Sequence, residues 1–223
     1  MLRKTFLAVS ALLVCSVGSL QAGTMITSAV KVSGNAAPIS IDQFSFDNGA
    51  PAYTDRGDPL NDPGDLGHTY QNVPSELVGA EYVMVSNSDK TSDPYQVDVT
   101  VSELSLIYVL LDNRVGGGDS SSTPTPMAWM TDGSIGLSPM VDTLVDVDID
   151  EGNDGSLDNA FSLFVTLALP GTYNFLGQND GGGRNNYGIL VSDTLVVPEP
   201  GTFVLAALGL VGFLACRTRR QTS

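Results

Sequence analysis

The chain has 223 residues, of which 10 are Lys or Arg and 25 are Asp or Glu, so its formal net charge is −15 at pH 7. Phosphate backbones repel a polyanion of this kind, which excludes nucleic acid as an expected partner. The length favours a single domain, and 24 glycines with 12 prolines indicate a turn-rich fold rather than a low-complexity chain.

The first 22 residues have the three parts of a secretory signal peptide. Arg3 and Lys4 form a positive n-region, an apolar stretch runs from Phe6 to Val17, and Ala22 ends a segment that suits signal peptidase. This apolar run is shorter than the roughly 20 residues that a membrane span needs. We therefore predict cleavage after residue 22, the alternatives being an N-terminal membrane anchor or a buried helix.

The body that follows, residues 23–197, shows hydrophobic periodicity of two. The strongest expected strands are residues 96–101, 104–111, 141–149 and 161–169, and weaker ones are 39–46, 81–85, 127–130, 173–176, 187–191 and 194–197. Clusters of Gly, Pro, Asn and Asp separate them. About eight to ten short strands predict an all-β fold, a two-sheet antiparallel sandwich that is jelly-roll-like.

Charge and cysteine content limit what the body can do. Cys15 lies in the signal peptide and Cys216 in the C-terminal tail, so the body has neither disulfides, nor thiolate metal sites, nor a cysteine nucleophile. It keeps five basic and 24 acidic residues, a net charge of about −19. Such a charge favours solubility and weakens the compact state by self-repulsion unless cations bind.

Four aspartates, named here the acidic row, are predicted to share one face of the strand at 141–149: Asp142, Asp146, Asp148 and Asp150. Calcium takes about 6 to 8 oxygen ligands and would convert their repulsion into a bound structure. The calcium candidates are Asp146, Asp148, Asp150 and Asp154. An EF-hand is excluded because Glu151 stands where that loop needs glycine. The alternative is a solvated strand face, or an edge strand whose acids discourage aggregation.

The body offers little for catalysis. A serine triad needs a general base, and the one histidine, His68, falls in a loop rich in Asp, Pro and Gly, far from the C-terminal position expected of such esterases. We predict no enzymatic activity, no catalytic residue and no cofactor apart from calcium, with His68 on a surface loop. Four aromatic residues would stack on sugar rings if one face exposed them, namely Tyr70, Trp129, Tyr173 and Tyr187. Otherwise Trp129 belongs to the core.

The C-terminal end carries three features in order. Pro198, Glu199 and Pro200 interrupt regular structure, residues 203–216 are an unbroken run of apolar and small residues, and Arg217, Arg219 and Arg220 close the run. As a helix the run spans about 21 Å, less than the roughly 30 Å hydrocarbon core. The arginines favour a cytoplasmic end. The predicted membrane-facing side chains are Phe203, Leu205, Leu208, Leu210, Phe213 and Leu214.

This order of features resembles the PEP-CTERM sorting signal of exported bacterial proteins. The resemblance begins at residues 197–202, with the sequence VPEPGT, and continues through the apolar run and the arginines. It implies recognition by exosortase, a polytopic membrane transpeptidase or protease, with cleavage near Pro198 to Pro200. A looser resemblance to a β-sandwich module of PEP-CTERM proteins rests on segments such as Asp112-Asn113-Arg114 and Asp148-Ile149-Asp150-Glu151, and it implies the fold only.

We therefore expect a signal peptide at 1–22, a β-sandwich domain at 23–197 and a sorting signal at 198–223 with a transmembrane-type helix. The expected protein is exported across the inner membrane to the cell envelope, surface or extracellular matrix. Its expected role is non-enzymatic, structural or adhesive, and associated with exopolysaccharide in a biofilm matrix. Exosortase and, transiently, the membrane are its expected partners. The alternatives are a carbohydrate-binding module, a polysaccharide-processing enzyme, and a single-pass membrane protein with a proline-rich stalk.

Overall fold

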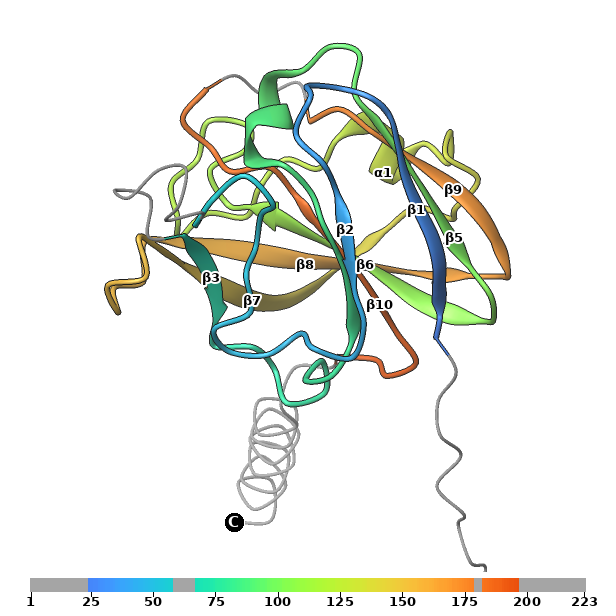
Figure 1. Ribbon diagram of the computed structural model, residues 1–223, viewed down its shortest axis with the longest axis horizontal. Coiled ribbons are helices and arrows are strands. Elements are labelled where there is room, and N and C mark those ends of the chain that lie inside the picture. The colour runs from blue at the N-terminus through green and yellow to red at the C-terminus, as the bar shows by residue number, and fades with distance from the viewer. Residues whose placement is uncertain (1–23, 58–66, 179–181, 197–223) are drawn as a thin grey trace, which may run out of the picture.

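The computed structural model describes residues 24–57, 67–178 and 182–196 (Figure 1). The predicted signal peptide, the Pro-Glu-Pro segment, the apolar run and the closing arginines lie outside the described residues. Within these ranges, no helix is both long and apolar enough to cross a membrane.

The described residues form two antiparallel sheets. Three strands make the smaller sheet in the order β1-β5-β9, with β1 at Ile26–Ser33, β5 at Gln96–Val101 and β9 at Gly171–Leu176. The larger sheet has the order β2-β4-β10-β6-β8-β7-β3. Its strands are β2 (Ser40–Asp42), β3 (His68–Gln71), β4 (Glu81–Met84), β6 (Ser105–Asp112), β7 (Val141–Glu151), β8 (Asn159–Ala168) and β10 (Gly188–Ser192). Two short helices, η1 (Asn87–Thr91) and α1 (Ala128–Thr131), complete the elements of the described ranges.

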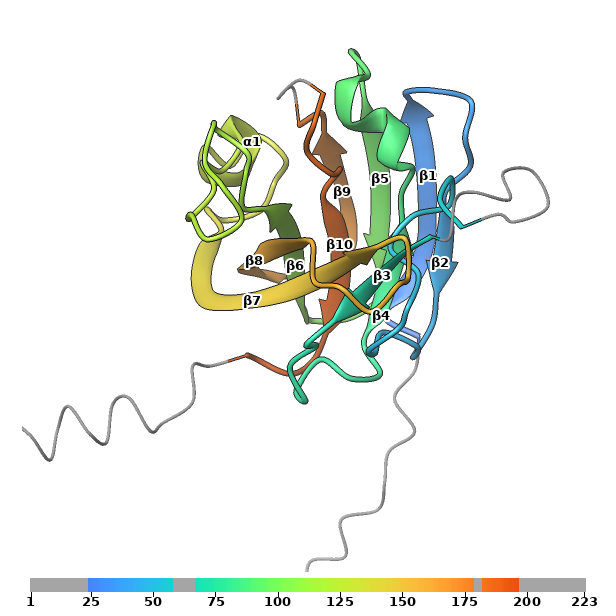
Figure 2. The same ribbon diagram turned by 90° about the vertical axis from the view of Figure 1, so that its left-hand side faces the viewer.

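One hydrophobic core joins the two sheets into a β-sandwich. Figure 2 shows β1, β5 and β9 side by side, with β7 and β3 crossing at another angle. In β5 the predicted alternation is exact, because Val97, Val99 and Val101 are buried while the residues between them are partly exposed. The continuous apolar run of β6 lies between β10 and β8, in the interior of its sheet, where both faces of a strand are covered.

Tyrosines supply much of the core and fasten the loops to it. Buried Tyr53, Tyr108 and Tyr187 donate their hydroxyl hydrogens to backbone carbonyls, those of Asn186 at 2.6 Å, Thr194 at 2.7 Å and Leu176 at 2.9 Å respectively. A buried hydroxyl needs such a partner, and these three bonds join residues that are 133, 86 and 11 positions apart in sequence. In a body without cysteine these bonds hold the loops in place.

Several sequence predictions need correction. Residues 127–130 were expected as a strand, but α1 occupies Ala128–Thr131, because a helical turn lets the neighbouring Trp129 and Met130 both reach the core. Residues 194–196 are not a strand either. The strands β1 and β3 were not predicted. In β1 the side chains of Val30 and Val32 are about half exposed, which obscures the alternation, and β3 is only four residues long.

Candidate functional site

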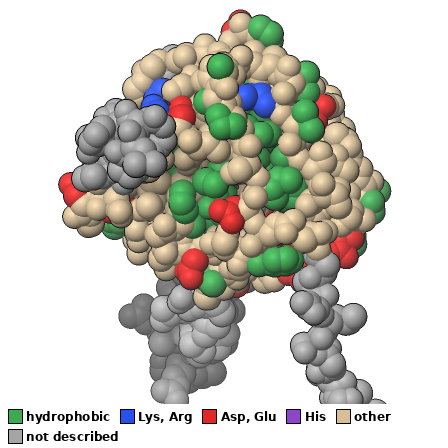
Figure 3. Space-filling view, viewed as in Figure 1, with side chains coloured by type: hydrophobic (Ala, Val, Ile, Leu, Met, Phe, Trp, Pro, Cys, Tyr) green, Lys and Arg blue, Asp and Glu red, His purple; other side chains and the backbone are tan. Residues whose placement is uncertain are grey.

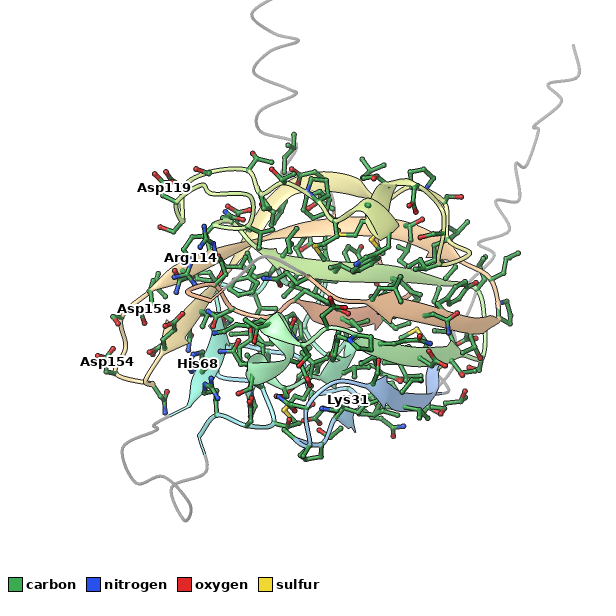
Figure 4. The ribbon with its side chains drawn as sticks, turned by 90° about the horizontal axis from the view of Figure 1, so that it is seen from above. Lys31, His68, Arg114, Asp119, Asp154 and Asp158 are labelled. Carbon is green, nitrogen blue, oxygen red and sulfur yellow. The ribbon has the colours of Figure 1, made fainter. Side chains whose placement is uncertain are left out.

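A polar pocket opens at one end of the sandwich, and four of the five Lys and Arg residues of the described ranges line it. We name it the basic pocket. Its volume is about 190 Å³ and its lining is Arg56, His68, Asn87, Lys90, Arg114, Glu151, Gly183, Arg184 and Asn185. Figure 4 shows Arg114 and His68 at the same end of the molecule, close to the loop that carries Asp154 and Asp158. In Figure 3 the Lys and Arg side chains of the visible face are few and lie near the top of the view.

Asp55 builds the first wall. Its carboxylate accepts hydrogen bonds from the Ser86 hydroxyl at 2.8 Å and from the backbone N–H groups of Asn87 and Ser88 at 2.7 and 3.0 Å. Burial on its own would raise the pKa of Asp55, but the bonds from Ser88, Ser86 and Asn87 together lower it. The carboxylate thus fixes the start of η1, and it also pairs with Arg56 at 3.3 Å. Lys90 is carried on the last turn of η1.

Asp112 builds the opposite wall from the end of β6. Its fully buried carboxylate holds the Arg114 guanidinium by two short bonds, from Nε at 2.9 Å and from an Nη at 2.6 Å. The backbone N–H of Asn185 donates to the same carboxylate at 2.7 Å. The hydrogen bonds that Arg114 donates to the Asp112 carboxylate raise the pKa of Arg114, and the nearby Glu151 acts in the same direction. A guanidinium that donates two hydrogen bonds to one buried carboxylate keeps a single orientation.

Three buried asparagines form the floor. Asn87 donates from its side-chain amide to the amide oxygen of Asn185 at 2.9 Å, and its own amide oxygen accepts the backbone N–H of Asn186 at 2.9 Å. Asn185 donates in turn to Glu151 at 2.6 Å, and the amide of Asn186 donates to the Ser86 carbonyl at 2.9 Å. A buried polar network in which each member has partners is rigid and specifies one geometry.

Lys90 differs from the other cations of the pocket. It forms no hydrogen bond or ion pair with another described residue, whereas Arg56 and Arg114 each pair with a carboxylate. Burial lowers the pKa of Lys90, and the positive charge of Arg56 lowers it further. Burial and the neighbouring guanidinium thus disfavour the charged form of Lys90, while the carboxylate of Glu151 acts in the opposite direction.

The acidic row lies on β7 as predicted, but protein donors already engage its carboxylates. Asp146 accepts from Ser162 and Asn113 at 3.1 and 3.2 Å, and Asp148 accepts from Asn72 at 2.6 Å. Among the residues that the structure describes, no three His, Cys, Asp or Glu side chains are arranged to hold a metal ion. The edge-strand interpretation is wrong from Asp148 onward, because β3 pairs with β7 there. Calcium binding at these aspartates and the alternative of a solvated strand face both stay predictions.

The remaining calcium candidates lie around the turn after β7. Asp150 is buried, and its carboxylate accepts the backbone N–H groups of Asp154 and Gly155 at 3.1 and 2.8 Å. Asp154 is exposed and accepts the backbone N–H of Ser156 at 2.9 Å. Both carboxylates thus shape the turn.

The aromatic platform considered from the sequence is excluded as a surface. Tyr70, Trp129, Tyr173 and Tyr187 are all buried, with at most 9% of any side chain exposed. Trp129 packs edge-on against Phe175 at 5.8 Å between ring centroids and donates from Nε1 to the Gly177 carbonyl at 3.2 Å. The core placement of Trp129 is confirmed.

The basic pocket was not predicted from the sequence. His68 was expected on a surface loop, but it is the first residue of β3, half-buried, with its ring 5.7 Å from that of Tyr53. The Lys and Arg residues of the pocket are far apart in the sequence, so no cluster of basic residues indicates a pocket. The one available signal was the segment Asp112-Asn113-Arg114, where a carboxylate two residues before an arginine follows a buried strand.

The comparisons with known proteins bear first on the C-terminal end. A family model for the PEP-CTERM protein-sorting motif matches residues 196–220. The chain carries a PEP-CTERM sorting motif. This match confirms the resemblance seen in the sequence, and the motif implies export, processing by exosortase and a location at the cell envelope or surface. A search of curated proteins found no match.

Two solved structures are similar in fold to the PEP-CTERM protein. A β-glucuronidase from glycoside hydrolase family 2 superimposes with a TM-score of 0.52 at 21% identity, over 73% of this chain and 14% of that one. A family 138 glycoside hydrolase targeting pectin rhamnogalacturonan II gives a TM-score of 0.46 at 10% identity, over 79% of this chain and 17% of that one. The chain therefore spans only a small part of either enzyme, and the likeness to the β-glucuronidase concerns the fold alone.

Proposed function

We propose that this PEP-CTERM protein is a non-enzymatic component of the cell surface or extracellular matrix that adheres to exopolysaccharide. The signal peptide at 1–22 starts its export, the apolar helix at 203–216 holds it briefly in the membrane, and exosortase cuts near Pro198 to Pro200. The body left behind is a sandwich of a three-stranded and a seven-stranded sheet. The observation that carries the proposal is the sorting motif at residues 196–220.

The junction between the sandwich and the motif supports this proposal. The backbone N–H of Val196 donates to the Tyr108 hydroxyl at 2.9 Å, and that hydroxyl donates to the Thr194 carbonyl at 2.7 Å. The last described residue is thus fastened to β6 in the centre of the larger sheet. Cleavage after this point leaves the core of the body intact, which a processed and released protein requires.

The position of the basic pocket supports a binding role for the body. β10 pairs with β6 from Gly188 opposite Leu110 to Ser192 opposite Leu106. Asn185 of the pocket precedes the first of these pairs, and Val196 follows the last. β1 begins and β10 ends at the lower side of Figure 1. The pocket residue Asn185 and the attachment point after Val196 therefore flank β10 at its two ends.

Two alternatives are a carbohydrate-binding module and a polysaccharide-processing enzyme, and an assay for reducing ends tests the second. A carbohydrate-binding module would use the basic pocket, since the aromatic rings are buried. A polysaccharide-processing enzyme is the third candidate, and the likeness to part of a β-glucuronidase supports only a shared fold. Incubation of the purified protein with exopolysaccharide from its host is expected to release no new reducing ends, and their appearance would overturn the non-enzymatic proposal.

Fractionation of the native host tests sorting and adhesion separately. Wild-type protein is expected in the envelope and matrix fractions, and a variant with Pro198, Glu199 and Pro200 changed to Ala is expected to stay unprocessed in the membrane. Thr202→Ala, next to the motif's Pro-Glu-Pro, serves as the control and is expected to be processed. In a host unable to make exopolysaccharide, the processed protein is expected in the medium. Equal processing of all variants contradicts sorting, and equal retention in both hosts contradicts adhesion.

A further inference from the structure

The basic pocket is an unusual concentration of positive charge for this chain. The protein has a net charge of −15, yet Arg56, Lys90, Arg114 and Arg184 converge on a single opening. Like charges at close range repel, and partial burial strengthens the repulsion because less water screens it. The carboxylates of Asp55 and Asp112 compensate Arg56 and Arg114, but Lys90 forms no hydrogen bond or ion pair with a described residue and has only the longer-range attraction of Glu151 and Asp55. An anion bound in the pocket would place a negative charge within hydrogen-bonding distance of the Lys90 ammonium group.

The pocket also offers hydrogen-bonding groups that its own network leaves unused. An amide nitrogen carries two hydrogens, and Asn87 and Asn185 each use one within the described residues. Glu151 accepts bonds from Asn159 and Asn185 on one oxygen, while its other oxygen has no hydrogen bond with a described residue. About a third of the Glu151 side chain is exposed, at 32%. These groups suit a ligand that bears hydroxyl groups as well as an acid.

We propose that the basic pocket binds an acidic sugar unit of an extracellular polysaccharide, with the sugar carboxylate at Lys90 and Arg114 and sugar hydroxyls at Glu151 and the two amides. This inference rests on the proposed adhesive function and names the ligand class for it. Glu151 repels any anion placed beside it, but only a ligand with hydroxyl groups offsets this repulsion by donating hydrogen bonds to the carboxylate oxygen that has no described partner. A polysaccharide with repeated acidic units can contact several copies of the protein at once, and this multivalency raises the overall affinity above that of a single contact.

Titration calorimetry on the processed protein purified from its host tests the inference. The probes are sodium glucuronate, glucose as the neutral sugar, and sodium sulfate as the bare anion. The variants are Lys90→Ala and the control Leu104→Glu, which changes the net charge by the same single unit. Leu104 is 57% exposed and precedes β6, whereas Arg114 follows it, so roughly 30 Å of strand separates the two sites.

The wild-type protein is expected to bind glucuronate, more weakly at high salt, and to bind glucose and sulfate at least about tenfold less tightly. Lys90→Ala is expected to lose at least about tenfold in glucuronate affinity, while Leu104→Glu keeps the wild-type value. Because Lys90 forms no hydrogen bond or ion pair with another described residue, its removal is expected to leave the melting temperature unchanged or slightly higher, which shows that the variant is folded.

Three results would overturn the inference. The first is no glucuronate binding, and the second is an unchanged glucuronate affinity in Lys90→Ala. The third is sulfate binding as tight as glucuronate binding, which indicates an adventitious ion only. Host fractionation separates this failure from failure of the proposed function. If Lys90→Ala protein is retained in the matrix as well as wild type, adhesion stands and uses another surface. If wild-type protein is not retained at all, the adhesive proposal itself is wrong.

Discussion

The carboxylate of Glu81 holds the start of the first strand, and its replacement by glutamine should destabilise the body. Glu81 lies on β4 and is fully buried. It accepts hydrogen bonds from the backbone N–H groups of Met25 at 2.7 Å and Ile26 at 2.8 Å. One carboxylate thereby fixes the entry of the chain into β1, directly after the predicted signal peptide.

The size of the effect follows from these two bonds. Glu81→Gln keeps the shape but replaces one oxygen by an NH₂ group, which faces a backbone donor and cannot accept. One charge-assisted bond is lost and one buried N–H is left unsatisfied, at a cost of about 2 to 3 kcal/mol after the carboxylate's desolvation is relieved. For a domain of this length about 1 kcal/mol shifts the melting temperature by roughly 2 to 4 °C, so a fall of about 4 to 12 °C is expected.

Thermal unfolding followed by circular dichroism measures this shift, and amide hydrogen exchange at Met25 and Ile26 locates it. Glu103→Gln is the matched control, because Glu103 is exposed. The melting temperature of this variant should equal that of the wild-type protein. If Glu81→Gln and Glu103→Gln melt together, or if exchange at Met25 and Ile26 is unaltered, the assignment of β1 anchoring to Glu81 is refuted.

Three further predictions concern packing, pH and calcium. A Cβ atom at Gly188 would lie 2.5 Å from the Tyr70 hydroxyl, so Gly188→Ala should lower the melting temperature by several degrees. Gly182→Ala is the control, because a Cβ atom there meets no atom within 4 Å, and its melting temperature should equal that of the wild type. Equal melting temperatures of the two variants would contradict the packing of Tyr70 against Gly188. Because the folded-state pKa of Asp55 is lowered, its contribution to stability is present above the ordinary Asp pKa near 4 and is lost as pH falls below that value. Asp55→Asn should therefore be less stable at pH 7 and show a flatter dependence of melting temperature between pH 5 and 2; parallel curves would contradict this. Since protein donors already engage the acidic row, a calcium chelator is expected to leave the melting temperature unchanged, and a fall would establish a calcium site.

The fold was predictable where burial depends on one strand at a time. The alternation of β5 and the apolar run of β6 follow directly from which faces meet the core, so their positions agree with the sequence to within a residue or two. Short elements, and strands whose apolar side chains are partly exposed, could not be predicted from the alternation of apolar and polar residues. The apolar residues of β1 point partly to solvent, and the helical turn of α1 contains the same residue types as a strand.

The basic pocket could not be predicted because it exists only after the sheets have paired. Arg56, Lys90, Arg114 and Arg184 come from four separate loops and turns, and the pairing of β6 with β10 and of β7 with β3 brings their ends together. Local pattern carries no information on such long-range register. The sorting motif is the opposite case, since its parts are contiguous and need no fold to be recognised.

Intact-mass spectrometry of the protein recovered from its native host tests the central claim most directly. We predict a mass that corresponds to a chain beginning near residue 23 and ending near residue 200, without the apolar run and the closing arginines. Recovery of a mature protein that still contains residues 203–223 would contradict sorting by exosortase.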